Sequence, residues 1–254
     1  MMAVSLNGRP LTAVILAAGA GTRLGKLGQR YSKPMVALLG APLIDWVIGG
    51  LRRAGVDRIV VVGHPADMSL ASFLRMRHPA APLVHQTERR GIADALRQAL
   101  PLIGDDAGHL ACACDSLFLV ADLTRLIACG RAQPEAAAVG VLDMGVGATT
   151  TRSAVRVHGD VIVEIIEKPA RDTAPSSLVA APLYWLPRRF ATYLDATPPV
   201  GGEAYVSTAL NAFIEAGGIV HAVPISERAE VTTAADIAPA ESWLRARAVL
   251  PRPP

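Results

Sequence analysis

Aromatic residues and cysteines are scarce in this sequence. Phe, Trp and Tyr together make up 4% of the 254 residues, and there are three cysteines. Three cysteines cannot form a disulfide framework, and Cys112 and Cys114, which alternate on an apparent strand, are expected to be core residues rather than metal ligands. Hydrophobic residues make up 51% and charged residues 19%, a composition that excludes a disordered chain and leaves Ala, Val, Leu and Ile to fill the core.

Long apolar runs and a strong excess of one charge are also absent. No stretch approaches the ~18 apolar residues of a spanning helix, so we expect no membrane partner. The net charge of +3 is small, and it fits a small anionic ligand as well as it fits nucleic acid. The arginine clusters at 52–53, 75–77 and 89–90 lack aromatic neighbours, so we interpret them as solvated faces and expect no nucleic-acid partner.

The apolar segment Leu11–Ala18 is compatible with a signal peptide or with a first buried strand. Arg9 is the charge that precedes it, Pro10 intervenes, and a glycine-rich turn follows directly. These features favour the strand, and the compartment predicted from the sequence is cytoplasmic.

Strands and helices alternate in the first half of the chain. Apolar or β-branched runs at 11–18, 58–63, 84 and 109–114 indicate strands, and helical spacing marks 44–51, 70–74 and 92–100. This alternation predicts a doubly wound α/β sheet. The second half differs, with a hairpin over 153–157 and 161–167, strands at 178–186 and 219–225, and helices at 207–216 and 236–247. No linker separates the halves, so we expect one domain, 1–254.

The most informative segment is the glycine-rich turn that follows the first strand. Gly19, Gly21 and Gly25 let backbone N–H groups surround a phosphate, and Arg23 and Lys33 add two cations. The spacing is also compatible with a variant dinucleotide fingerprint that uses Asp45. That alternative is disfavoured because Asp45 begins an apparent helix and because the second strand starts too late for a compact βαβ unit. The P-loop pattern is absent.

The segment Ile15–Gly25, followed by Ser32-Lys33-Pro34-Met35, resembles the signature of nucleotidylyltransferases that act on sugar phosphates. The resemblance implies a three-layer α/β/α Rossmann-like fold with a mixed, mainly parallel sheet. It implies a reaction of NTP with a sugar 1-phosphate that gives NDP-sugar and pyrophosphate. Arg23 and Lys33 would then be catalytic, Arg23 on the triphosphate and Lys33 on the α-phosphate or the attacking phosphate. The nucleotide would also contact Ala18, Gly19, Gly21 and Thr22.

Further segments resemble the same family. Gln86 and Gly91 keep the spacing of the base-recognition segment in uridylyl and thymidylyl members, so UTP or dTTP is favoured. Asp115, at the end of a strand, resembles the family's metal-binding Asp, which implies Mg²⁺ as the cofactor. By the same resemblance, the sugar phosphate would be bound by Glu167, Lys168, Tyr184 and Glu203.

One position departs from the family pattern. Thr208 stands where the resemblance places a second metal-binding Asp, so Glu230 or Asp236 is considered as a substitute ligand. The segment from Glu230 to Asp236 also resembles cytidylyltransferases, which keeps a CTP enzyme for a polyol or amino-alcohol phosphate as an alternative. A catalytically reduced, nucleotide-binding regulatory subunit is a further alternative.

The resemblance assigns about 11–145 to nucleotide binding and about 146–250 to the sugar phosphate. The partners expected are therefore an NTP and a phosphorylated small molecule. The oligomeric state is left open, a homo-oligomer included.

Overall fold

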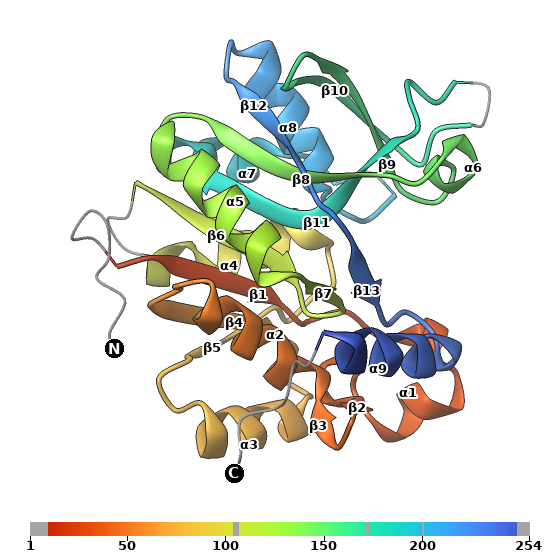
Figure 1. The fold of residues 1–254 in the computed structure, drawn as a ribbon. Coiled ribbons are helices and arrows are strands. Elements are labelled where there is room, and N and C mark those ends of the chain that lie inside the picture. The colour runs from red at the N-terminus through yellow and green to blue at the C-terminus, as the bar shows by residue number, and fades with distance from the viewer. Residues whose placement is uncertain (1–9, 104–106, 171–172, 200, 248–254) are drawn as a thin grey trace.

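A nine-stranded mixed sheet forms the centre of the computed structural model, which describes residues 10–103, 107–170, 173–199 and 201–247 (Figure 1). The order of its strands is β5 (Leu83–His85), β4 (Arg58–Gly63), β1 (Thr12–Leu16), β6 (Gly108–Ala113), β11 (Leu178–Pro187), β8 (Ala137–Asp143), β12 (Val220–Pro224), β10 (Val161–Glu167) and β9 (Ser153–His158).

The direction of pairing divides the sheet into two parts. Strands β5, β4, β1 and β6 are all parallel. Beyond β6 most pairs are antiparallel, and β8 with β12 is the parallel pair. The expected mixed sheet is therefore confirmed, with parallel pairing concentrated in the first half. The difference arises because the β9–β10 hairpin and β11 reverse the direction of the chain.

Strand β1 is buried on both faces. Ala13 and Ile15 belong to one core cluster, whereas Val14 and Leu16 belong to the other. A continuous apolar run is what a strand covered on both faces requires, so the segment is a core strand, as predicted.

Helices cover both faces of the sheet and complete the expected three layers (Figure 1). One layer contains α2 (Leu43–Arg53), α3 (Met68–Arg77), α5 (Val120–Ala132) and α9 (Ile237–Ala246). The other contains α4 (Ile92–Ile103), α7 (Ala191–Ala196) and α8 (Val206–Glu215).

Several elements were not predicted from the sequence. The buried face of α5, Leu123, Leu126, Ile127 and Gly130, follows helical spacing and was available to the same reasoning as the other helices. Strand β8 was also missed, although Ala137–Val141 is an apolar run. The short elements carry too little periodicity to predict; they are α1 (Lys26–Arg30), β2 (Ala37–Leu38), β3 (Ala41–Pro42), β7 (Ser116–Phe118), α6 (Val146–Thr149) and β13 (Arg228–Glu230).

The described residues also test two expectations from composition. None of their helices combines the length and apolarity needed to cross a membrane. Cys112 and Cys114 are buried thiols, as expected of core residues. Burial, reinforced by the nearby Asp115, raises the pKa of Cys112 to about 12, so this thiol stays protonated at neutral pH.

Candidate active site

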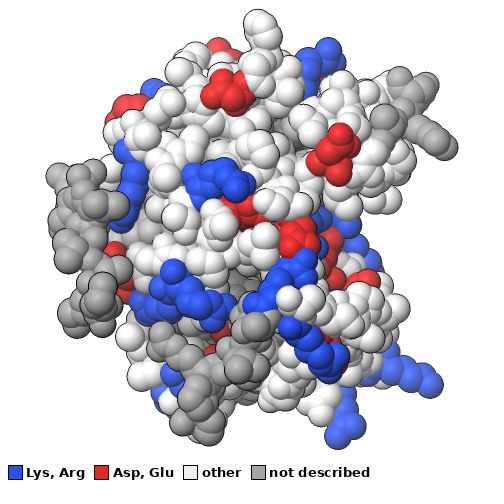
Figure 2. Space-filling model, in the orientation of Figure 1, with Lys and Arg blue, Asp and Glu red and all other residues white. Residues whose placement is uncertain are grey.

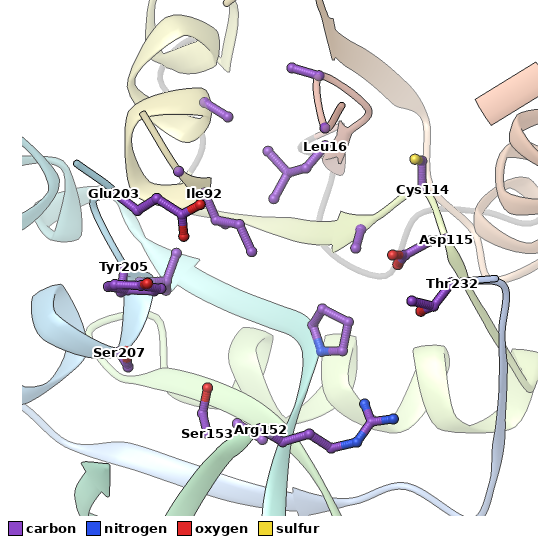
Figure 3. Close-up of a pocket in the computed structure, with 18 of the residues that line it drawn as sticks. Leu16, Ile92, Cys114, Asp115, Arg152, Ser153, Glu203, Tyr205, Ser207 and Thr232 are labelled. Atoms are coloured by element: carbon purple, nitrogen blue, oxygen red, sulfur yellow. The ribbon is translucent and has the colours of Figure 1, made fainter. Parts of the chain in front are cut away.

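A cavity of about 650 Å³ opens at the carboxyl ends of β1 and β6 (Figure 3). These neighbouring strands lie where the strand order reverses direction, which is where open α/β sheets bind ligands. The cavity is lined by residues expected from the sequence, namely Ala18, Gly19, Gly21, Thr22, Arg23, Lys33, Gln86, Gly91, Asp115, Glu167, Lys168, Tyr184, Glu203 and Glu230. Asp236 and Thr208 are not among its lining residues.

The glycine-rich turn forms one end of the cavity. Gly21 has a φ of 64° and precedes a short 3-10 turn at Thr22–Leu24. This left-handed conformation carries little cost for glycine, and it lets the chain leave β1 sharply. Arg23 is exposed and makes no ion pair with another described residue, so its guanidinium is available to an anion.

Lys33 and Asp115 meet across the cavity floor. The Lys33 Nζ donates to Asp115 Oδ2 in an ion pair between partly buried side chains. The other oxygen, Asp115 Oδ1, accepts a 3.2 Å hydrogen bond from Ser116 Oγ. The fold thus brings together the cation after the glycine turn and the carboxylate after β6.

The Gln86 side chain is buried and its amide donors are used within the protein. Its Nε2 donates to the carbonyl oxygen of Gly91 at 3.0 Å and to Asp94 Oδ2 at 2.8 Å. Both partners are acceptors, so the orientation of the amide follows from this network, and Oε1 remains available. The amide therefore offers a substrate an acceptor alone, and not the donor–acceptor pair expected from the sequence.

Gly91 packs against the backbone of Ala204, which stands between the cavity-lining residues Glu203 and Tyr205. It has a φ of 90°, and a Cβ at this position would lie 2.6 Å from the carbonyl oxygen of Ala204. The backbone N–H of Ala204 donates to the carbonyl oxygen of Arg90 at 2.7 Å, and the backbone N–H of Ala93 donates to the carbonyl oxygen of Ala204 at 3.0 Å. Glycine is required because two backbone segments touch here.

Two hydroxyl groups hold the carboxylate of Glu167. Its Oε2 accepts hydrogen bonds from Ser153 Oγ at 2.6 Å and from Ser207 Oγ at 3.2 Å. The neighbouring Lys168 places Nζ 5.5 Å from the centre of the Tyr205 ring. Figure 3 shows Glu203 and Tyr205 on the opposite side of the cavity from Asp115.

Tyr184 lines the cavity and carries a protonated phenol. Burial, reinforced by the charge of Glu167, raises the pKa of Tyr184 above its usual value. The phenol is therefore a hydrogen-bond donor and not a base at neutral pH.

Strand β13 and the two residues after it supply a wall of alternating residues. Arg228, Glu230 and Thr232 line the cavity, whereas Ala229 and Val231 are buried in the core between them. The strand pairs antiparallel with β7, and the backbone N–H of Val231 donates to the backbone carbonyl oxygen of Asp115 at 2.9 Å. This period of two brings the C-terminal part of the chain beside Asp115.

Neither substitute metal ligand considered from the sequence has a free carboxylate. Glu230 pairs with Arg152 at 2.8 Å and with Arg228 at 3.1 Å. Burial raises the pKa of Glu230, but Arg228 and Arg152 outweigh burial and hold that pKa below its ordinary value. Asp236 accepts the backbone N–H groups of Thr232 and Thr233 and serves as part of a capping box.

Among the described residues, no group of three or more His, Cys, Asp or Glu side chains could hold a metal ion. A metal ion in this cavity would therefore need ligands from outside the chain in addition to one or two of the chain's carboxylates.

Sequence reasoning missed several residues of the cavity wall. Arg89 was interpreted as solvated, yet its Nε donates to the carbonyl oxygen of Ala18 at 3.1 Å and ties the Gln86 segment to the glycine turn. Arg152 and Arg228 carry no motif and meet Glu230 through long-range folding. On the face of the molecule drawn in Figure 2, Lys and Arg are interspersed with Asp and Glu, without one continuous patch of either sign.

A family model described as nucleotidyl transferase matches residues 12–226. The chain belongs to this family. A family relative, UTP--glucose-1-phosphate uridylyltransferase AglF of Haloferax volcanii, is 30% identical over 220 residues, which cover 85% of this chain and 88% of that protein. The 2-aminoethylphosphonate cytidylyltransferase of Lancefieldella rimae is 42% identical over 83 residues, which cover 32% of this chain and 33% of that protein.

Solved structures share the nucleotidyl transferase fold. A UDP-glucose pyrophosphorylase from Acinetobacter baumanii superposes with a TM-score of 0.83 over 96% of both chains, at 20% sequence identity. At that identity the likeness shows the fold alone. Several curated relatives are matched over much less than two thirds of their own length, between 21% and 33%.

Proposed function

We propose that this protein transfers a nucleotidyl group from an NTP to a sugar 1-phosphate, giving NDP-sugar and pyrophosphate. The observation that carries the proposal is the convergence of Arg23, Lys33 and Lys168 on one cavity beside Asp115. The family match supports the reaction class, and AglF supports a uridylyl transfer to glucose 1-phosphate.

The geometry suggests how the chain's residues would act. The N–H groups of the glycine turn and Arg23 bind the triphosphate, while Lys33 neutralises charge at the α-phosphate. Lys168 holds the acceptor phosphate, and Glu167 and Glu203 accept hydrogen bonds from sugar hydroxyls. The attacking phosphate oxygen is already ionised at neutral pH, so the residues position the reactants and stabilise charge without a general base.

The residues also fit Mg²⁺. This ion is commonly held by one or two carboxylates together with substrate phosphates, and Asp115 supplies one carboxylate. When bound, Mg²⁺ supplies charge neutralisation on the phosphates.

The Gln86 amide offers the base one acceptor, Oε1, because both of its N–H donors are used within the protein. This oxygen can accept from N3–H of uracil or thymine and also from the 4-amino group of cytosine, so it does not by itself select the base. UTP or dTTP is the proposed donor because AglF, a UTP-dependent uridylyltransferase by name, is 30% identical over 85% of this chain.

A cytidylyltransferase for an amino-alcohol or polyol phosphate is the second candidate. The 42% identity to the 2-aminoethylphosphonate cytidylyltransferase over 83 residues supports it. The regulatory-subunit alternative rested on Thr208, which is not among the cavity-lining residues, so that motivation is weaker.

Each half of the chain is proposed to bind one substrate. Residues of about 11–145 bind the nucleotide, and those of about 146–250 bind the acceptor.

Pyrophosphate release tests the proposal. UTP, dTTP, CTP, GTP and ATP are each combined with hexose 1-phosphates and with 2-aminoethylphosphonate in the presence of Mg²⁺. We expect release with UTP or dTTP and a hexose 1-phosphate; release with CTP and 2-aminoethylphosphonate selects the second candidate. NTP binding by calorimetry without turnover for any pair would instead support a regulatory subunit.

A further inference from the structure

Arg228 is a buried cation inside the cavity with an unused donor. Its side chain is 5% exposed and its Nη2 donates to Glu230 Oε2 at 3.1 Å. Its Nη1 is buried and has no hydrogen-bond partner among the described residues. Buried donors are normally satisfied, and Arg228 is among the residues that line the cavity, so a ligand anion beside this guanidinium is a candidate for the missing partner.

The surroundings of Arg228 place this donor near Asp115 and Tyr184. Glu230 is shared with Arg152, and the other charged or polar groups that act on Arg228 are Asp115 and Tyr184. None of these residues belongs to the glycine turn. Figure 3 shows Arg152 extending from Ser153 toward the side of the cavity that holds Asp115 and Thr232.

Arg152, Arg228 and Glu230 form a cluster of three charged side chains with a net charge of +1. Two guanidinium groups share the single carboxylate of Glu230, so the cluster keeps a net positive charge. Glu230 holds Arg228 in one orientation, and Arg152 keeps Glu230 in place. A second anion is the chemical complement of such a cluster.

We propose that Arg228 binds the phosphate of the acceptor substrate and positions its attacking oxygen beside Asp115. The inference rests on the proposed nucleotidyl transfer and assigns a substrate-binding role to a residue outside every motif in the sequence. The attacking oxygen forms a bond to the α-phosphorus, and the bond to the bridging oxygen breaks with its electron pair leaving on pyrophosphate. Arg228 exchanges neither electrons nor a proton in this step, so it remains a positioning cation.

Phosphate binding to the nucleotide-loaded protein tests the role without turnover. The protein is first saturated with an α,β-methylene analogue of UTP, or of CTP if the panel selects it, because this analogue cannot release pyrophosphate. Inorganic phosphate is then titrated by calorimetry into the wild type, Arg228→Met and Arg156→Met. Arg156 pairs with Glu164 on the exposed β9–β10 hairpin and serves as the matched control.

We expect Arg228→Met to weaken phosphate binding by about 10- to 100-fold, the usual effect of one charge-assisted hydrogen bond. Arg156→Met binds phosphate as the wild type does, and the affinity for the analogue is unchanged in both variants. With an active substrate pair, the acceptor KM rises in Arg228→Met while the NTP KM stays constant. Glu230 keeps Arg152 as a partner in Arg228→Met. Arg228→Lys keeps the charge, and its phosphate affinity is expected to lie between those of the wild type and Arg228→Met.

Three results would overturn the assignment. Phosphate binding unaltered in Arg228→Met, or no phosphate binding by the analogue-loaded wild type, removes the role. Weakened analogue binding in Arg228→Met with phosphate binding intact would place the residue on the nucleotide instead. Failure of the wild type to bind any nucleotide analogue contradicts the proposed function itself, which separates the two failures. If Arg228→Met does not fold, wild-type affinity in Arg228→Lys together with Arg228→Gln counts against the role.

Discussion

The side of the cavity proposed to bind the nucleotide and the side proposed to bind the acceptor are built differently. On the nucleotide side a turn after one parallel strand presents backbone N–H groups and Arg23, which makes no ion pair with another described residue. On the acceptor side the carboxylates of Glu167 and Glu230 are held by hydroxyl or guanidinium groups from distant segments. The first side depends on local backbone shape, and the second depends on side chains brought together by antiparallel strands.

Replacing Lys33 breaks the contact between the nucleotide side and Asp115. We expect Lys33→Ala to lower kcat/KM by about 100- to 1,000-fold, because a preorganised charge on the reacting phosphate is lost. Folding should change little, since Lys33 is at the cavity surface and not in the core. The matched control is Lys26→Ala, an exposed lysine outside the cavity lining, and wild-type turnover in Lys33→Ala would remove the assignment.

Replacing Asp115 tests which carboxylate serves the metal. Asp115→Asn should raise the Mg²⁺ concentration for half-maximal activity by at least roughly 10- to 100-fold. Loss of a residue that only hydrogen-bonds a metal ligand already costs about that much in metal affinity. Mg²⁺ titration of initial rates gives the measurement. Asp195→Asn, on the exposed face of α7, is the control. Equal Mg²⁺ dependence in Asp115→Asn and the wild type would show that another group holds the ion.

The base-binding role of Gln86 predicts a smaller change. Gln86→Met keeps the length of the side chain and removes the Oε1 acceptor, so the KM for UTP should rise about 2- to 10-fold, the value of one neutral hydrogen bond. Gln98→Met, exposed on α4, is the comparison variant and should keep the KM of the wild type. An unchanged KM for UTP in Gln86→Met would contradict the role.

His109 lies on β6, the strand at which the two sides of the sheet join, and gives a prediction about stability. Burial lowers the pKa of His109 to about 4, below its usual 6.5. As the pH falls below 6.5, His109 becomes protonated in the unfolded chain but stays neutral in the folded chain, so the free energy of unfolding decreases. Between pH 7 and pH 5.5 this amounts to roughly 1 kcal/mol.

The stability test compares unfolding at the two pH values. We expect His109→Leu to reduce the difference between the free energies of unfolding at pH 7 and pH 5.5. His158→Leu, at the exposed end of β9, should leave it as in the wild type. The same pH dependence in all three proteins would mean that other groups cause it.

The contrast between the two sides also explains what the sequence could predict. The glycine turn, Arg23 and Lys33 follow one strand at short range, so their spacing is visible in the chain itself. Gln86 was placed at the cavity, but the use of its donors by Gly91 and Asp94 depends on three-dimensional packing. The antiparallel part of the sheet was read as a hairpin and isolated strands, because register between distant strands leaves no local pattern.

The acceptor side was least accessible to sequence reasoning. Arg152, Glu230 and Arg228 come from separate segments and have no motif that links them. Thr208, which was matched to a metal-binding position, is not among the cavity-lining residues, whereas Thr232, two residues after the end of β13, lines the cavity. Only the pairing of β13 with β7 places alternate residues of that strand beside Asp115.

That pairing has a consequence for the order in which the protein matures. The strand that completes the cavity wall is made after all of the main sheet has been synthesised, and it must dock on β7 before Arg228 and Glu230 can reach the reaction centre. A nascent chain that has reached β12 already carries the glycine turn, Lys33 and Asp115, and also Lys168 for the acceptor phosphate. It lacks Arg228 and Glu230, so it would meet an acceptor without the cations that β13 brings to the cavity wall.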